Sequence, residues 1–148
     1  MRLPKNGVKL WRRSVDISVR NKTNCALISG VSFKTFFNNF TIPASETLFD
    51  PRVLYDQLHG RCLVSVESRN SGNTDQFLYI AASTSSSCTT WRRIRFVLSR
   101  VSPVALFCKA LASDFYDFPS SGYMGTRMVV TSNLFPAAGG GTWYDHLD

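Results

Sequence analysis

Residues 61–82, "RCLVSVESRNSGNTDQFLYIAA", contain the clearest structural signal in this chain. In 61–69, Cys62, Val64 and Val66 recur at every second position, which is typical of a strand with one face on a core. Residues 70–75 are rich in turn formers, and the apolar run 76–82 follows them. The stretch therefore predicts a strand, a loop and a second strand.

Working outward, the same signals predict further strands on both sides of this stretch. They include residues 14–20, 94–101, 103–111 and 126–132. Residues 24–37 mix β-branched and aromatic side chains around Gly30, and predict a strand or a strand with a bulge.

One helix is predicted over residues 51–59. Asp50 is a good N-cap, and Pro51 suits the first helical turn. Apolar residues follow at helical spacing and end before Gly60. The expected helix is about two turns long.

Many short strands and one helix, without alternation of strands and helices, predict an all-β fold, which we expect to be an eight-stranded antiparallel sandwich. The jelly roll is a common eight-stranded sandwich. At 148 residues the chain is long enough for one domain with its own core. We divide it into an N-terminal arm (1–13), a sandwich domain (14–132) and a flexible glycine-rich extension (133–148).

Positive charge is concentrated at the start of the chain. The net charge is +7, and residues 1–22 contribute +6 of it, with seven basic residues and one acidic residue. A basic arm on a nearly neutral body indicates a polyanionic partner, which is nucleic acid or an anionic membrane surface. The alternative is a solvated terminus that collects charge by chance.

A second basic cluster, "WRRIRF", occupies residues 91–96. Arginines beside aromatic residues can stack on bases or hold phosphates. They also suit a protein–protein interface. A solvated strand face is the third interpretation, and the sequence does not separate the three.

Catalytic chemistry has little support. The chain has two histidines, His59 and His146, and a histidine at a helix end is usually a capping or surface residue. No nucleophile elbow, phosphate-binding loop or zinc-protease motif occurs. We therefore expect no enzyme. Asp114 and Asp117 have a spacing that can share a calcium ion, although two solvated acids in a loop have the same spacing.

The four cysteines form no C-x-x-C pair, so a zinc site is not expected. Cys25, Cys62 and Cys108 lie in apolar runs, where a free thiol behaves as a small hydrophobe, and we expect them in the core. No stretch has the length of a signal peptide core or a membrane span, which predicts a soluble protein made in the cytosol.

The order of elements resembles a known family. A basic arm and two strands precede "TLFDPRVLYDQLHGRCLVSVESRNSGNTDQFLYIAAS", residues 47–83. This order is similar to the shell domain of single jelly-roll capsid proteins of small icosahedral (satellite) RNA viruses. The positions that match the family are apolar, tyrosine and arginine residues: Leu54, Tyr55, Leu58, Arg61, Val64 and Val66. The arm here is shorter than is common in that family.

The resemblance implies a coat protein that assembles with copies of itself into a shell and packages single-stranded RNA. It implies a virion protein that is made in the host cytoplasm, with viral RNA and itself as partners and no membrane. Asp114 and Asp117 would bind calcium between subunits. The RNA-binding residues would be basic and aromatic: Lys5, Lys9, Trp11, Arg12, Arg13, Arg20 and Lys22. The alternative is a non-viral, monomeric β-sandwich that binds RNA.

Overall fold

The structure is a computed structural model, and it describes residues 8–12, 16–72, 75–98, 115–124 and 127–135. The described residues form three antiparallel sheets and one short helix, so the all-β prediction is confirmed. The jelly-roll connectivity stays a prediction. The elements in chain order are β1 (Val8–Arg12), β2 (Asp16–Asn21), β3 (Leu27–Ser32), α1 (Phe33–Phe36), β4 (Thr47–Asp56), β5 (Arg61–Arg69), β6 (Gln76–Ser83), β7 (Trp91–Val97), β8 (Phe115–Met124) and β9 (Arg127–Phe135).

The middle sheet has the strand order β4-β5-β6-β7, and the predicted strands in 61–82 are β5 and β6. Val66 lies opposite Tyr79 in their register. All residues from Cys62 to Ser68 are buried, so β5 is covered on both faces and not on one face as its alternation predicted. A strand buried on both faces lies at the centre of the molecule.

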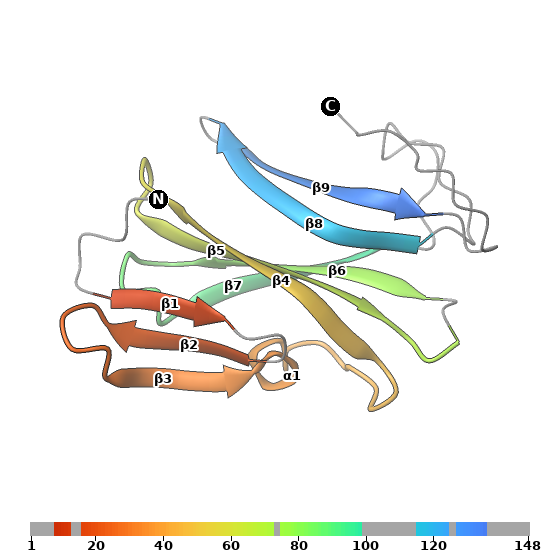
Figure 1. Cartoon of the computed structure of the whole chain (residues 1–148), viewed down its shortest axis with the longest axis horizontal. Helices are drawn as coiled ribbons and strands as arrows, with labels where there is room; N and C mark the ends of the chain where they lie inside the picture. The colour runs from red at the N-terminus through yellow and green to blue at the C-terminus, as the bar shows by residue number, and fades with distance from the viewer. Residues whose placement is uncertain (1–7, 13–15, 73–74, 99–114, 125–126, 136–148) are drawn as a thin grey trace.

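Two smaller sheets cover the middle sheet from opposite sides (Figure 1). The sheet β1-β2-β3 and α1 lie on one side, and Ile17 of β2 belongs to the same core cluster as Val64 and Val66 of β5. The pair β8-β9 lies on the other side, where β8 packs against β4 and β5. Ser132 of β9 donates a hydrogen bond to the buried Glu67 carboxylate at 2.6 Å, which ties the two layers together.

The predicted helix over 51–59 is wrong, because residues 51–56 belong to β4. The pairing of β4 with β5 shifts between Phe49 and Arg52, and Asp50 has a positive φ of 44°. Proline has no N–H to donate to a sheet, and a bulge is one of the places where a strand tolerates it. Asp50 and Pro51 thus form a bulge, although the same residue pair is typical of a helix start.

The end of the expected helix is instead the turn between β4 and β5. The Asp56 carboxylate accepts hydrogen bonds from the backbone N–H groups of Leu58 (2.9 Å) and His59 (3.2 Å). Gly60 has a φ of 63°, which glycine adopts at little cost. The turn chemistry of Asp56 and Gly60 closes this hairpin.

The helix of the described residues is α1, in a segment expected to be a strand. Ser32 is its N-cap, and the Ser32 hydroxyl accepts a hydrogen bond from the Thr35 N–H at 3.2 Å. Phe33, Phe36 and Phe37 are buried at helical spacing. These three rings place α1 on the core. No helix among the described residues is long and apolar enough to cross a membrane.

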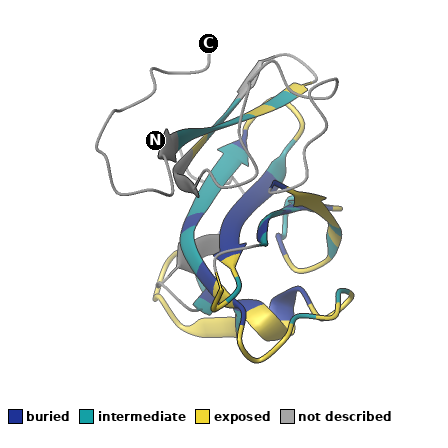
Figure 2. Cartoon of the chain, turned by 90° about the vertical axis from the view of Figure 1, so that its right-hand side faces the viewer, coloured by how far each residue is buried: buried dark blue, intermediate teal, exposed yellow. Residues whose placement is uncertain are grey.

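The core lies between the middle sheet and the β1-β2-β3 sheet with α1, and Figure 2 shows the buried residues gathered on the middle sheet. Tyr79 of β6 is at its centre, with the Phe37 ring 5.1 Å and the Phe40 ring 5.8 Å from its own ring centre. The buried members of the cluster are Ile17, Phe33, Phe36, Phe37, Leu48, Val64, Val66, Tyr79 and Ala81.

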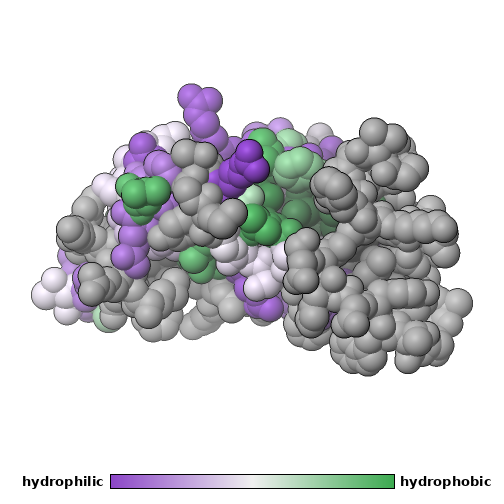
Figure 3. Space-filling view, turned by 90° about the horizontal axis from the view of Figure 1, so that it is seen from above, coloured by the Kyte–Doolittle hydropathy of each residue, from purple (hydrophilic) through white to green (hydrophobic). Residues whose placement is uncertain are grey.

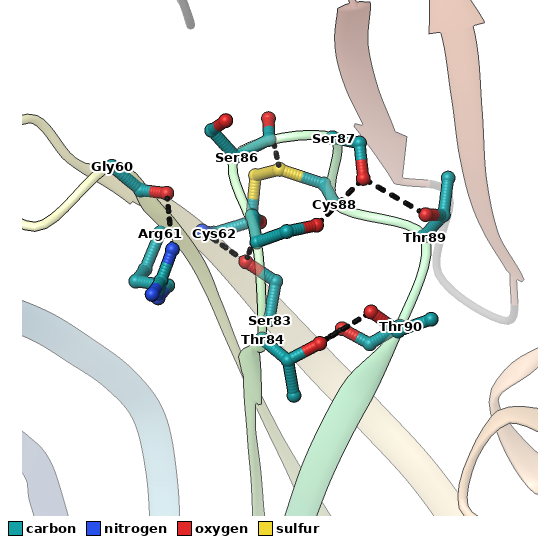
Figure 4. Close-up of a disulfide and its surroundings, with 11 residues drawn as sticks. Gly60, Arg61, Cys62, Ser83, Thr84, Ser86, Ser87, Cys88, Thr89 and Thr90 are labelled. Carbon is teal, nitrogen blue, oxygen red and sulfur yellow. Dashed lines mark hydrogen bonds between the residues drawn. A yellow bond between two sulfur atoms is a disulfide. The ribbon is translucent and has the colours of Figure 1, made fainter.

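The expectation of free core cysteines is wrong at two positions. Cys62 of β5 is buried but forms a disulfide with Cys88 of the β6–β7 loop (Figure 4). Cys25 is exposed in the β2–β3 turn, where its φ is 59°. Cys108 lies outside the described residues. Ser83 supports the bridge, since its hydroxyl accepts from the Cys62 N–H at 2.9 Å and donates to a loop carbonyl at 2.7 Å.

Candidate nucleic-acid interface and subunit surface

The first two strands bring basic residues of the expected arm together with those that follow it. β1 takes up residues 8–12 of the arm and pairs with β2. In this register Lys9 lies opposite Arg20, and Trp11 lies opposite Ser18. Arg12 lies opposite Ile17. Residues of the arm are therefore neighbours, across a strand pair, of residues that follow the arm.

The remaining described basic residues of this group are Arg20, near the end of β2, and Lys22, in the turn after β2. Arg20 donates from Nη1 to the Cys25 carbonyl at 3.0 Å, so its side chain spans the turn. Lys22 is exposed at the turn itself. Cations at the end of a strand pair suit phosphate contacts, which position an RNA chain without reading its sequence. Lys5 and Arg13 lie outside the described residues.

The second basic cluster, in β7, is divided between two faces of the middle sheet. Arg93 and Arg95 lie on the inner face with the core aromatic rings. The Arg93 guanidinium is 4.8 Å from the centre of the Phe36 ring, and that of Arg95 is 4.8 Å from the centre of the Phe77 ring. Arg95 also donates to the Thr41 carbonyl at 3.4 Å. These two arginines stack on rings of the protein itself.

The outer face of β7 is exposed and apolar. Ile94 and Phe96 are 51% and 49% exposed, and their partners across the sheet are Ile80 and Leu78. Side chains of directly opposed residues share a face, so these four residues form one surface, the outer β6–β7 patch. Arg92 is exposed on the same face. Figure 3 looks down on the side that carries β8 and β9, and shows an open apolar area there.

A second apolar surface lies on β3. Leu27 and Ile28 are 58% and 50% exposed although they are adjacent in the strand. Adjacent strand residues point to opposite faces, so β3 is exposed on both faces. Among the described strands, β3 is also at an edge of its sheet. An apolar edge strand is a surface on which another chain can pair.

Two carboxylates near the core have structural partners. Glu46 is buried and accepts hydrogen bonds from the Ser68 hydroxyl (2.6 Å) and the Tyr79 hydroxyl (2.7 Å). Burial raises the pKa of Tyr79 to about 12, and the hydrogen bond to Glu46 acts in the same direction. This network orders the centre of the core.

The turn after β4 holds the other carboxylate. His59 lies in this turn with its Nδ1 2.6 Å from the Asp56 carboxylate. Burial opposes ionisation of Asp56, but the hydrogen bonds from His59 and the turn N–H groups outweigh it and hold the pKa of Asp56 below its ordinary value. The expected helix-end histidine is thus a turn residue.

The calcium prediction is not tested by the structure. Asp114 lies outside the described residues, and Asp117 lies in β8 opposite Asn133. No group of three histidine, cysteine or acidic residues that could hold a metal occurs among the residues that the structure describes. The pair Asp114 and Asp117 remains a prediction.

Sequence reasoning missed the outer β6–β7 patch and the exposure of β3. The signal for the patch was present, because Ile94 and Phe96 alternate with Arg93 and Arg95 in β7. This alternation shows which residues share a face but not which face is covered. Comparison of the chain with protein-family models, with curated proteins and with solved structures gave no match.

Proposed function

We propose that this chain is the coat subunit of a small icosahedral RNA virus, which assembles with copies of itself and packages single-stranded RNA. In this proposal the protein resides in the virion and is made in the host cytoplasm. The sandwich would follow the jelly-roll connectivity, and Asp114 and Asp117 would bind calcium between subunits.

The outer β6–β7 patch is the observation that carries the proposal. Single exposed apolar residues are normal on a monomer, but a contiguous apolar surface marks an interaction site. Full burial of such a side chain contributes about 1.5–3 kcal/mol, so the half-exposed Ile94 and Phe96 would contribute about 1 kcal/mol each. Each subunit of a closed shell repeats the contact, and small contributions then add up.

Exposure of β3 on both faces supports the same proposal. A second copy that covers Leu27 and Ile28 would remove an apolar edge strand from water. The surfaces on β3 and β7 belong to different sheets, so one subunit can contact more than one neighbour. A closed shell requires several such contacts on each subunit.

The charge distribution supports RNA as the cargo. The first 22 residues contribute +6 of the net charge of +7, and β1 and β2 place Lys9 opposite Arg20. Contacts of this kind are independent of RNA sequence and weaken with salt. Many copies that act on one RNA molecule make a short arm sufficient.

Substitution in the outer patch tests the proposal. We expect Ile94→Asp and Phe96→Asp each to abolish assembly of the purified chain, as measured by sedimentation velocity. Leu58→Asp is the matched control, because Leu58 is an apolar residue that is 68% exposed in a turn outside the patch. Assembly of the control must equal that of the wild type.

Two results would contradict the proposal. One is a wild-type chain that stays monomeric at all protein concentrations and binds RNA in a salt-dependent way, which is the behaviour of a monomeric RNA-binding β-sandwich. The other is normal assembly of both patch variants, which would remove the patch as its basis.

A further inference from the structure

We propose that β3 pairs edge to edge with β3 of a second copy of this chain, antiparallel and across a two-fold axis. The two three-stranded sheets β1-β2-β3 would then join into one continuous sheet. The choice of a second copy as the partner rests in part on the proposed coat function. The contact is separate from the outer β6–β7 patch, which belongs to another sheet.

β3 is exposed along almost its whole length. Every residue from Leu27 to Val31 is exposed, and three of them are apolar. Leu27, Ile28 and Val31 are 58%, 50% and 38% exposed. β3 packs on β2 and α1, and it is the outermost strand of its sheet (Figure 1). A single copy of the chain therefore leaves these apolar side chains open to water.

The sequence of β3 does not protect its free edge. Natural edge strands usually carry charged residues, a proline or a bulge, which hinder pairing with another chain. The sequence LISGVS contains no charged residue and no proline. The register with β2 shifts once, between Val19 and Arg20, and it is regular from Ser29 to Ser32. Most of β3 therefore offers a regular edge to a further strand.

The other described edge strands are protected, and this identifies the partner. β1 contains Lys9 and Arg12, and β7 contains three arginines. β4 contains Asp50 and Pro51 at its bulge. Both strands of the pair β8-β9 contain a charged residue. Among the residues that the structure describes, β3 is thus the edge strand without charge or proline, so the strand of a second copy that fits it best is again β3.

A two-fold axis through the middle of β3 makes the pairing self-complementary. Ser29 and Gly30 are the middle residues of the strand, so an axis near them lets the two copies pair along most of its length. Two uncharged strands place no like charges opposite each other, and apolar pairs across strands are favourable. The paired strands would satisfy each other's backbone groups and shield the exposed apolar side chains.

Sedimentation velocity of the Ile94→Asp chain tests this contact alone, because that substitution removes the outer-patch contact by which the shell closes. We expect this chain to form dimers. Ile28→Lys in the same background should weaken the dimer about 10-fold or more, since a lysine on an edge strand hinders pairing. Leu58→Lys is the matched control: Leu58 is 68% exposed in a turn outside β3, and its replacement should change the dimer dissociation constant by less than about 2-fold.

Cross-linking gives a second measurement that keeps the apolar residues of β3. In the Ile94→Asp background with Cys25→Ser, a short bifunctional thiol reagent should join two copies of Ser29→Cys, because near the axis they lie within about 8 Å of each other. The chain with its natural Cys25 and Ser29 is the control. In an antiparallel pair its two Cys25 residues lie roughly 20 Å or more apart, so it should form no covalent dimer.

Dimers that are insensitive to Ile28→Lys would overturn the β3 pairing, as would cross-linking of Ser29→Cys that is no better than that of Cys25. An Ile94→Asp chain that is monomeric at every concentration would also overturn it. That result would leave the coat function intact, because particle formation by the wild type tests that function. A wild-type chain that forms β3 dimers and no particles would overturn only the coat function.

Discussion

Removal of the Cys62–Cys88 disulfide should destabilise the fold by a predictable amount. The two cysteines are 26 residues apart, and closing a loop of this size lowers the entropy of the unfolded chain. The loop-closure relation gives a stabilisation of about 3.5 kcal/mol at 25 °C. Because the bridge joins β5 at the centre of the molecule to the β6–β7 loop, the whole domain should respond.

Urea unfolding with and without dithiothreitol measures this contribution. Slopes of about 1–3 kcal/mol per molar urea convert 3.5 kcal/mol into a midpoint shift of roughly 1 to 3.5 M. The Cys25→Ser background removes the exposed thiol and its side reactions, and light scattering confirms that the subunits are dispersed. In the same background, the double variant Cys62→Ala and Cys88→Ala should unfold at the reduced midpoint and ignore dithiothreitol.

An unchanged wild-type midpoint in dithiothreitol, with the reduced state verified by thiol titration, would refute this reasoning.

The oxidation state of the disulfide also depends on where the protein is located. Cytosolic glutathione keeps most thiols reduced, so we expect the bridge to form after the protein leaves the reducing cytosol. Mass spectrometry of alkylated protein from particles and from cell lysate measures this difference.

Three other predictions address the core, the pH dependence and the arm. Glu46→Ala should lower the free energy of unfolding by about 2–4 kcal/mol, because the buried Ser68 and Tyr79 hydroxyls lose their acceptor. Glu46→Gln should lower it by about half as much in the same urea assay. Equal losses in the two variants would contradict this account. Asp56→Asn should lose about 1–2 kcal/mol near neutral pH. The folded-state pKa of Asp56 lies below its unfolded value, so the loss of unfolding free energy in Asp56→Asn should be complete above a pH of about 4 and vanish as the pH falls through the lowered pKa. A loss that is independent of pH would refute the stabilising hydrogen bonds of the Asp56 carboxylate. Four arm cations can be replaced together by neutral polar residues: Lys5, Lys9, Arg12 and Arg13. This variant should lose most packaged RNA and keep partial assembly, and the slope of log affinity against log salt should fall by up to about 3. Unchanged RNA uptake at physiological salt would contradict the role of the arm and indicate that the arginines of β7 bind the RNA.

Parts of the fold that depend on local signals were predictable. β5 and β6 have β-branched and apolar residues around a turn-rich loop, and both were predicted to within one residue. The sequence 50–60 contains signals that serve a helix or a bulged hairpin equally well. Asp50 and Pro51 can start a helix or form a bulge, and pairing with β5 decided between them. Phe33, Phe36 and Phe37 have helical spacing, but they were included in a strand prediction that rested on the β-branched and aromatic residues around Gly30.

The features of the candidate site that were missed depend on distant pairings. Cys62 and Cys88 meet because β6 turns back along β5, and spacing alone does not reveal that. The sequence does not distinguish Arg92 from Arg93. Only the packing of α1 against the middle sheet shows that Arg93 faces Phe36. Lys9 and Arg20 are neighbours because of the register between β1 and β2. Such long-range contacts decide where the candidate surfaces of this chain lie.

Electron microscopy of the purified wild-type chain, combined with the ratio of absorbance at 260 and 280 nm after nuclease treatment, tests the coat function most directly. The proposal predicts uniform closed particles that protect RNA from nuclease. Monodisperse single subunits at high protein concentration, with all RNA digested, would contradict it.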